Sequence, residues 1–220
     1  MRSSRRVVLA TALSTLLLLA ACGGDGWNDE RPAPGPVGAL GPGFVPTPTP
    51  SPEATITPVP GSWDDVHPGP GYRVVLLTSG DDAPTRTLMA GVEDWADDED
   101  VSLKIVTVDD QRAVLDRIDE AIALHPDLVV SAGNDLVDPL TAVTAHHLEQ
   151  QFLVVGAELA EPTGNVTAAR WPGATFRGEG LTTSSGYDPS TFTPARVDRA
   201  VRAGVAAVLS DVRGVVVQVS

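Results

Sequence analysis

Two short polar stretches, "TSGDDAPT" (78–85) and "SAGNDLVD" (131–138), carry the residues best suited to bind a small polar molecule. Each combines a glycine and carboxylates with the expected start of a helix, where free backbone N–H groups donate hydrogen bonds to a ligand. The side chains themselves can bond sugar hydroxyls or ring nitrogens. The candidate ligand-binding residues are Ser79, Gly80, Asp81, Asp82, Gly133, Asn134 and Asp135.

The same residues also have a purely structural interpretation. Asp and Asn are preferred N-cap residues, because their side chains accept from free N–H groups of the first helical turn. A carboxylate at that position also interacts favourably with the helix dipole. The sequence leaves both interpretations open.

Other chemistries fit these residues less well. An acidic magnesium pocket would be formed by the carboxylates that follow the first two expected strands, Asp81, Asp82, Asp109 and Asp110. A phosphoryl-receiver site would need an aspartate at the end of the third strand and a lysine near the fifth. Ser131 stands at the first position, and Lys104, the one lysine, lies in the second expected strand. The receiver interpretation therefore fails.

The sequence offers no catalytic residue that we can name. It contains no GxGxxG after the first strand, no P-loop and no GxSxG. His146 and His147 are adjacent on an expected helix, where neighbouring side chains point apart, which favours a solvated face over a metal site. We expect a protein that is not an enzyme and that uses no metal or cofactor, with an enzyme on this scaffold as the least favoured alternative.

Alternating strands and helices must position the two polar stretches. Continuous apolar runs predict strands and apolar periodicity near 3.6 predicts helices. The expected strands are 72–80, 101–110, 127–133, 152–157, 165–171 and 213–220, and the expected helices are 83–99, 110–126, 138–151 and 193–212.

This order predicts an α/β domain over 71–220, with a single doubly wound parallel sheet covered on both faces. A strand order of 2-1-3-4-5 puts the reversal point between the first and third strands, where ligands of such folds bind. Both polar stretches would then line one crevice. The last strand, "GVVVQVS" (214–220), either joins the edge of its own sheet or pairs with another molecule. We favour its own sheet.

Residues 1–21 have the pattern of a secretory signal: a basic start, an apolar run, and "LAAC" ending at Cys22. These four residues resemble the lipobox of bacterial lipoproteins, which implies that Cys22 is lipidated and anchors the chain to the extracytoplasmic face of the membrane. An ordinary secretory signal is the alternative. Cys22 is the one cysteine of the chain, which excludes an intrachain disulfide and paired-cysteine zinc sites.

Residues 22–70 are rich in proline and threonine and lack apolar periodicity. Because proline forbids helix, and because the stretch offers little to bury, we expect an extended, disordered tether. The net charge of the whole chain is −14, which argues against nucleic acid as a partner.

Residues 72–220 resemble the first half of the basic membrane protein family. The resemblance is carried by the order of elements and by "RVVLLTSGDDAPTRTLMAG", "HPDLVVSAGNDLVDPLTAVTAHHLEQQFLVVGAE", "GNVTAARW" and "RAGVAAVLSDVRGVVVQVS". These are purine-nucleoside-receptor-like solute-binding lipoproteins of ABC transporters, with a type I periplasmic-binding fold. The resemblance implies a small-molecule ligand, nucleoside-like or sugar-like, and an ABC permease as partner.

Two departures from the family bear on the ligand. In the family, the loop after the first strand typically carries Asp-Asp-x-Ser-Phe-Asn. The Phe stacks on the nucleoside base, and the Asn forms a hydrogen bond with it. Here Asp81 and Asp82 keep the acidic pair, whereas Thr85 and Arg86 replace the aromatic and the amide, and Gly156 stands where relatives often have Asp. The resemblance therefore leaves nucleoside specificity open.

In the family a second lobe follows the strand that resembles 214–220, and it closes over the ligand. The sequence here ends at Ser220, so we expect a one-lobed form that binds weakly unless a second-lobe protein supplies the other wall. The alternative is a non-catalytic surface module that binds another protein. The stretch 173–192 has no periodicity and is expected to be either a lid or a floppy loop.

Overall fold

In the computed structural model the described residues are Trp27, 31–178 and 186–220. The expected signal segment 1–21 and Cys22 lie outside them. In the described part of the chain, no helix is long and apolar enough to cross a membrane.

A single parallel sheet of seven strands forms the centre of the domain, in the order β1-β7-β6-β5-β4-β2-β3. Every neighbouring pair runs parallel. The strands are β1 Thr55–Ile56, β2 Arg73–Ser79, β3 Ser102–Val108, β4 Leu128–Ala132, β5 Phe152–Val155, β6 Val166–Arg170 and β7 Val216–Gln218. The single doubly wound parallel sheet expected from the sequence is confirmed, because every residue of β4 and β5 is buried between two helical layers.

In the part of the chain that the structure describes, four α-helices and three short 3₁₀ turns connect these strands. They are α1 Ala83–Asp98, η1 Gln111–Ala113, α2 Val114–Ala123, η2 Asn134–Leu136, α3 Val137–Thr144, η3 Pro189–Thr191 and α4 Pro194–Leu209. Helices α1 and α4 cover one face of the sheet and share one apolar cluster with it, whereas α2 and α3 cover the other face. The two faces thus have separate cores.

Close packing between α1 and α4 depends on a glycine. A Cβ atom at Gly91 would lie 2.4 Å from Cγ1 of Val197, which is closer than side chains tolerate. The absence of that atom lets the two helices touch along the sheet. Their contact places the start of α1, and with it the loop after β2, beside the segment that precedes α4.

The strand order agrees with the expected 2-1-3-4-5, since β3, β2, β4, β5 and β6 follow one another in the sheet. The expected position of the last strand is also confirmed: β7 pairs with β6 of its own sheet through Ala168–Val216 and Ala169–Val217. Yet β7 is not an edge strand. Its outer side pairs with β1, which comes from the proline-rich segment.

The expected extended tether is not what the structure shows for residues 31–70. This segment lies against the domain and buries four apolar side chains, Phe44, Ile56, Trp63 and Val66, in the cluster shared by α1 and α4. Proline excludes helix but leaves an irregular chain free to pack. Since burying one large apolar side chain contributes about 1.5–3 kcal/mol, these four side chains help to hold the segment against the domain.

The third helix is shorter than predicted, ending at Thr144 instead of continuing to Gln151. The reason is a tertiary contact: the buried side-chain amide of Asn165, just before β6, donates to the carbonyl oxygens of Thr144, His147 and Gln150 at 3.0–3.1 Å. These three carbonyl groups accept hydrogen bonds from Asn165, and the chain turns here instead of continuing as a helix. The helical position predicted for His146 and His147 is therefore wrong.

Candidate functional site

A small pocket lies where the strand order reverses, between the ends of β2 and β4. The chain leaves β2 to form β3 on one side and returns to form β4 on the other, so the two loops part and leave a space. The cavity measures about 150 Å³. It is lined by Ser79, Asp82, Pro84, Thr85, Leu88, Gly133, Asn134, Asp135, Tyr187 and Phe192. We call it the β2–β4 pocket.

The structure brings five of the seven candidate residues together in the lining, Ser79, Asp82, Gly133, Asn134 and Asp135. Gly80 and Asp81 are exposed and do not line the pocket. The backbone carbonyl of Asp81 accepts a hydrogen bond from the Arg86 guanidinium. Asp81 therefore lies on the exposed side of the loop, outside the pocket lining.

Asp82 is an N-cap, as the structural interpretation expected. Its Oδ1 accepts from the Thr85 backbone N–H at 3.0 Å, and its Oδ2 accepts from the Thr85 hydroxyl at 2.9 Å. A carboxylate oxygen has two lone pairs, so each oxygen keeps one acceptor position. Capping fixes the direction of this carboxylate without using all of its capacity to bind a ligand.

A second carboxylate faces the same space. At Gly80, the position that a Cβ would occupy lies 3.6 Å from Oδ2 of Asp82 and 4.0 Å from Oδ2 of Asp135. Gly80 has φ +85°, a conformation that glycine adopts without strain. The two carboxylates, from different loops, therefore come close together beside Gly80 and both line the pocket, and no side-chain bond caps η2.

Glycine is also required where the two loops approach each other. A Cβ at Gly133 would lie 2.6 Å from the backbone oxygen of Ser79, and φ at Gly133 is +117°. Ser79 itself is buried, and its hydroxyl accepts from the side-chain amide of Gln111 at 2.7 Å. The pocket floor is therefore rigid and closely packed.

Aromatic side chains form a wall that the sequence did not predict. Tyr187 and Phe192 line the pocket with ring centroids 5.6 Å apart, and Phe192 packs edge-on against Trp171 at 4.9 Å. The Trp171 indole N–H donates to the Thr191 hydroxyl at 3.0 Å, which holds the wall in place. Two aromatic residues in an otherwise polar stretch, within a chain that is 5% aromatic, are the signal that could have identified them.

The described parts of the stretch 173–192 fold over the pocket. Residues 173–178 and 186–192 lie side by side, joined by a bridge between Ala174 and Tyr187 and by the Thr175 N–H donating to Gly186 O at 3.1 Å. The part between them, 179–185, lies outside the described residues. Whether the whole stretch acts as a lid stays a prediction.

A buried ionic cluster supports the base of this stretch. The Glu158 carboxylate, after β5, lies 3.1 Å from Nε of Arg170 and 3.4 Å from Nε of Arg177. The Glu158 backbone N–H also donates to Phe176 O at 2.9 Å. These contacts join the ends of β5 and β6 to the segment that carries the aromatic wall.

The pocket is electrostatically negative. Two carboxylates line it, and no Lys, Arg or His is among its lining residues in the described part of the chain. Desolvation by burial and, next, the charge of Asp82 raise the pKa of the Tyr187 hydroxyl. The Tyr187 hydroxyl stays neutral, and the two carboxylates accept hydrogen bonds, which suits ligands that carry donor groups.

The alternative magnesium pocket finds no support in the geometry. Asp110 caps the turn η1, accepting from the Arg112 N–H at 3.0 Å, and Asp109 and Asp110 do not line the β2–β4 pocket. Over residues 31–178 and 186–220, no group of three or more His, Cys, Asp or Glu side chains is placed to hold a metal ion.

No known protein family and no curated protein matches the chain. Among solved structures, it is similar to an ABC transporter system solute-binding protein from Aeropyrum pernix K1, with 20% identity over 46% of this chain and a TM-score of 0.42. A fragment of a protein named as a lipoprotein, from Peptoclostridium difficile 630, matches at 15% identity over 63% of this chain and 98% of its own length, with a TM-score of 0.46.

An ABC transporter system solute-binding protein from Conexibacter woesei DSM 14684 is similar at 17% identity over 46% of this chain, with a TM-score of 0.37. The match spans 35% of that protein, and 29% of the Aeropyrum protein. Membership of the basic membrane protein family stays a prediction from the sequence.

Proposed function

We propose that this protein is a cell-surface lipoprotein whose α/β domain binds a small, hydroxyl-bearing solute in the β2–β4 pocket. The observation that carries the proposal is the pair of carboxylates, Asp82 and Asp135, facing one gap beneath an aromatic wall at the reversal point of the sheet. That is the place where ligands of doubly wound folds bind.

The lining defines the chemistry of the solute. Carboxylates accept hydrogen bonds from hydroxyl or amine groups, while the amide of Asn134 both donates and accepts. The ring of Tyr187 offers an apolar surface for the C–H face of a sugar or for a flat base. We favour a sugar or the ribose part of a nucleoside, in line with the ligand class implied by the resemblance.

The size of the pocket limits affinity. Pockets that bury most of a drug-sized ligand measure roughly 300–1,000 Å³, and this one is about 150 Å³. It accommodates one ring, and a larger ligand would extend into solvent. We propose weak binding by this domain alone, with a permease or a second-lobe protein as the partner that covers the exposed side.

The proposed location follows from the first 22 residues. A signal segment that ends in "LAAC" supports export and acylation of Cys22, and two acyl chains give durable anchoring because each buried CH₂ contributes about 0.8 kcal/mol. The domain would then work on the extracytoplasmic face of the membrane.

Thermal unfolding of the mature chain with monosaccharides and nucleosides tests the proposal. A solute at 100 times its Kd should stabilise the folded state by about 2.7 kcal/mol. Asp135→Ala should abolish the shift. Asp97→Ala serves as the matched control, because Asp97 is an exposed aspartate of α1 outside the pocket. Absence of any shift at millimolar solute in the unaltered chain would contradict solute binding.

A second candidate function, a protein-interaction module, is favoured by the outer side of β3. In the described residues β3 pairs only with β2, and Ile105 on it is 44% exposed. A free strand edge accepts an added strand from another chain. Recovery of one envelope protein in fixed proportion by the unaltered chain, and its loss with Ile105→Lys, would favour this function over solute binding.

A further inference from the structure

We infer that the edge of the sheet where the strands begin faces the lipid bilayer, and that the β2–β4 pocket opens away from it. We call these the start edge and the end edge. The inference rests on the lipid anchor of the proposed function and adds an orientation to it. It depends on where the chain that follows Cys22 is fixed to the domain.

Trp27 provides the first point of attachment. Its side chain is only 3% exposed, and its indole N–H donates to the Ser102 hydroxyl at 3.1 Å. The Lys104 ammonium lies 4.7 Å from the ring centroid, and the Arg73 guanidinium lies 6.0 Å from it. Because Ser102 is the first residue of β3, these contacts hold the chain at the start edge.

Arg31 provides the second point of attachment, on the same edge. Its guanidinium donates to Oδ2 of Asp127 at 2.7 Å and to the Gly71 carbonyl at 2.6 Å. The same Asp127 oxygen accepts from the Arg73 backbone N–H at 2.8 Å. Asp127 precedes β4 and Arg73 opens β2, so this contact ties the N-terminal segment to two central strands where they begin.

The length of chain before Trp27 limits how the domain can turn. Four residues lie between Cys22 and Trp27, and the five Cα–Cα steps that join these two residues reach at most about 18 Å when fully extended. The seven residues of β2 alone span about 23 Å. The pocket lies at the far end of that strand. If the end edge faced the bilayer, Trp27 would stand farther from the membrane than the chain from Cys22 to Trp27 reaches.

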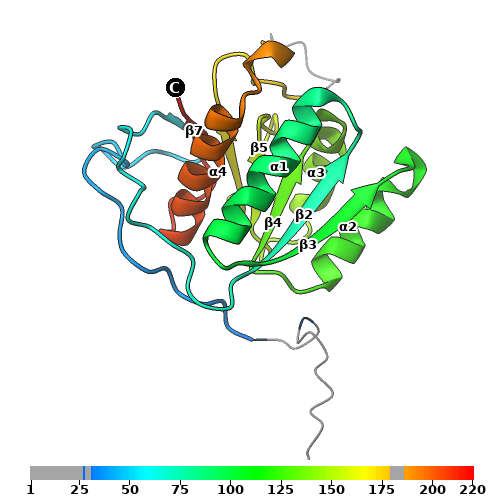
Figure 1. Cartoon of the computed structure of the whole chain (residues 1–220), viewed down its shortest axis with the longest axis horizontal. Coiled ribbons are helices and arrows are strands. Elements are labelled where there is room, and N and C mark those ends of the chain that lie inside the picture. Colours follow the sequence, from blue (N-terminus) through cyan, green and yellow to red (C-terminus); the bar gives the residue numbers. More distant parts are fainter. Residues whose placement is uncertain (1–26, 28–30, 179–185) are drawn as a thin grey trace, which may run out of the picture.

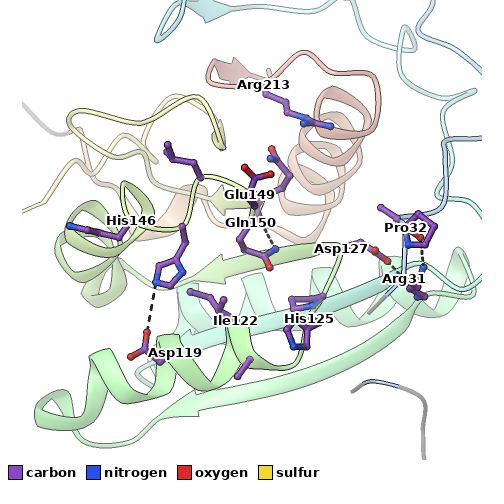
Figure 2. A pocket seen from close by; sticks show the side chains of 16 residues that line it. Arg31, Pro32, Asp119, Ile122, His125, Asp127, His146, Glu149, Gln150 and Arg213 are labelled. Carbon is purple, nitrogen blue, oxygen red and sulfur yellow. Dashed lines mark hydrogen bonds and ion pairs between the residues drawn. The ribbon is translucent and has the colours of Figure 1, made fainter. Parts of the chain in front are cut away.

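The side chains of the start edge fit the surface of a bilayer. A groove of about 1080 Å³ runs along it, with Arg31 and Pro32 toward one end and His146 and Asp119 toward the other, as Figure 2 shows. Three of the four histidines of the sequence line it, His125, His146 and His147, together with Arg31 and Arg213. Leu148, 59% exposed, adds an apolar contact.

The charges that line the groove and those that line the β2–β4 pocket differ as well. Of the three carboxylates in the groove, Asp127 is paired with Arg31, and Asp119 lies 4.0 Å from Nε2 of His147, while Glu149 is the third. No cationic side chain lines the pocket at the end edge, among the residues that the structure describes. The groove lining is therefore less negative than the pocket lining, which favours the groove as the side that approaches anionic lipid headgroups.

Energy transfer from the two edges to the membrane tests this orientation. The lipidated full-length chain is reconstituted into vesicles of phosphatidylethanolamine and phosphatidylglycerol that contain an acceptor on the headgroup. A donor dye is attached at Leu148→Cys, at the start edge, or at Ser190→Cys, exposed beside the aromatic wall. Acylation blocks Cys22, so each variant carries one reactive thiol. We expect several-fold stronger transfer from position 148, and equal or stronger transfer from 190 would overturn the inference.

A spacer variant isolates the role of chain length. Insertion of about twenty Gly and Ser residues between Cys22 and Trp27 adds a flexible span of about 25 Å, comparable to the length of β2. The difference between the two dye positions should then shrink, and its persistence would show that the short chain is not what orients the domain. If the protein fails to sediment with vesicles, the anchor is absent and the orientation falls with it. Solute binding, measured by thermal shift in solution, would still stand or fail by itself.

Discussion

The two edges of the sheet are built from the same strands and differ in what they hold. At the start edge, the N-terminal segment crosses the strands and is fixed by a buried carboxylate, Asp127, which binds both Arg31 and the backbone of Arg73. At the end edge, Asp82 and Asp135 face an open gap. In this parallel sheet the N-terminal segment therefore occupies one edge, whereas the other edge keeps an open pocket.

The largest expected effect concerns the segment that covers the start edge and β7. Phe44 is 1% exposed and packs edge-on against Trp63, with 6.4 Å between ring centroids. Phe44→Ala should lower the free energy of unfolding by about 3–5 kcal/mol, because it removes a large buried ring. Val37→Ala, at a side chain that is 53% exposed, should change it by less than about 0.5 kcal/mol. Urea unfolding of the mature chain measures both.

Equal, small effects of Phe44→Ala and Val37→Ala would contradict the packed segment and restore the extended tether. The length of chain between the membrane and the domain would then grow from four residues to almost fifty. The same result would therefore remove the basis for the proposed orientation, while the β2–β4 pocket would be unaffected.

The packing of residues 31–70 could not be read from composition, for a physical reason. Proline and threonine content shows that a segment cannot form a helix, and it says little about whether scattered apolar side chains find a surface. Phe44, Ile56 and Trp63 are spaced irregularly, so no periodicity marks them. The sheet, in contrast, could be predicted, because continuous apolar strands and capped helices repeat in a fixed order.

For a related reason, only part of the candidate site could be predicted from the sequence. Strand order brings the loops after β2 and β4 together, so the meeting of Asp82 and Asp135 follows from topology alone. Tyr187 and Phe192 reach the pocket from a segment without periodicity, and tertiary contacts such as Trp171 Nε1 to the Thr191 hydroxyl hold that segment in place. Contacts of this kind leave no local pattern in the sequence.

The next effect in size is a loss of folding stability in alkaline solution, and it depends on Tyr72 at the start edge. Burial and, to a lesser degree, the charge of Asp127 raise the pKa of Tyr72, which precedes β2. The folded state therefore keeps the hydroxyl protonated at a pH where the unfolded chain has begun to lose its proton, near pH 10. The unfolded state then binds fewer protons, so stability is complete below pH 10 and falls above it by about 1.4 kcal/mol per pH unit.

Tyr72→Phe should remove most of this alkaline loss, since the chain contains only one other tyrosine and a single lysine. Urea unfolding of both proteins between pH 8 and 11 measures the difference. Tyr187→Phe, at the end edge, is the matched control, because Tyr187 is 42% exposed and should account for a smaller part of the slope. An alkaline slope that survives in Tyr72→Phe would mean that burial of the Tyr72 hydroxyl is not its cause.

The smallest expected effect separates capping from binding at the end edge. Asp82→Ala removes both bonds to Thr85 and should lower the free energy of unfolding by about 1 kcal/mol, the usual cost of losing an N-cap. Asp82→Asn retains an acceptor for the Thr85 N–H and should recover most of that stability.

If Asp82 also binds a solute through its charge, Asp82→Asn will be folded and stable and yet show a weaker thermal shift with sugars than the unaltered chain. An unchanged thermal shift in Asp82→Asn would assign Asp82 to capping alone and leave Asp135 as the carboxylate that a ligand meets.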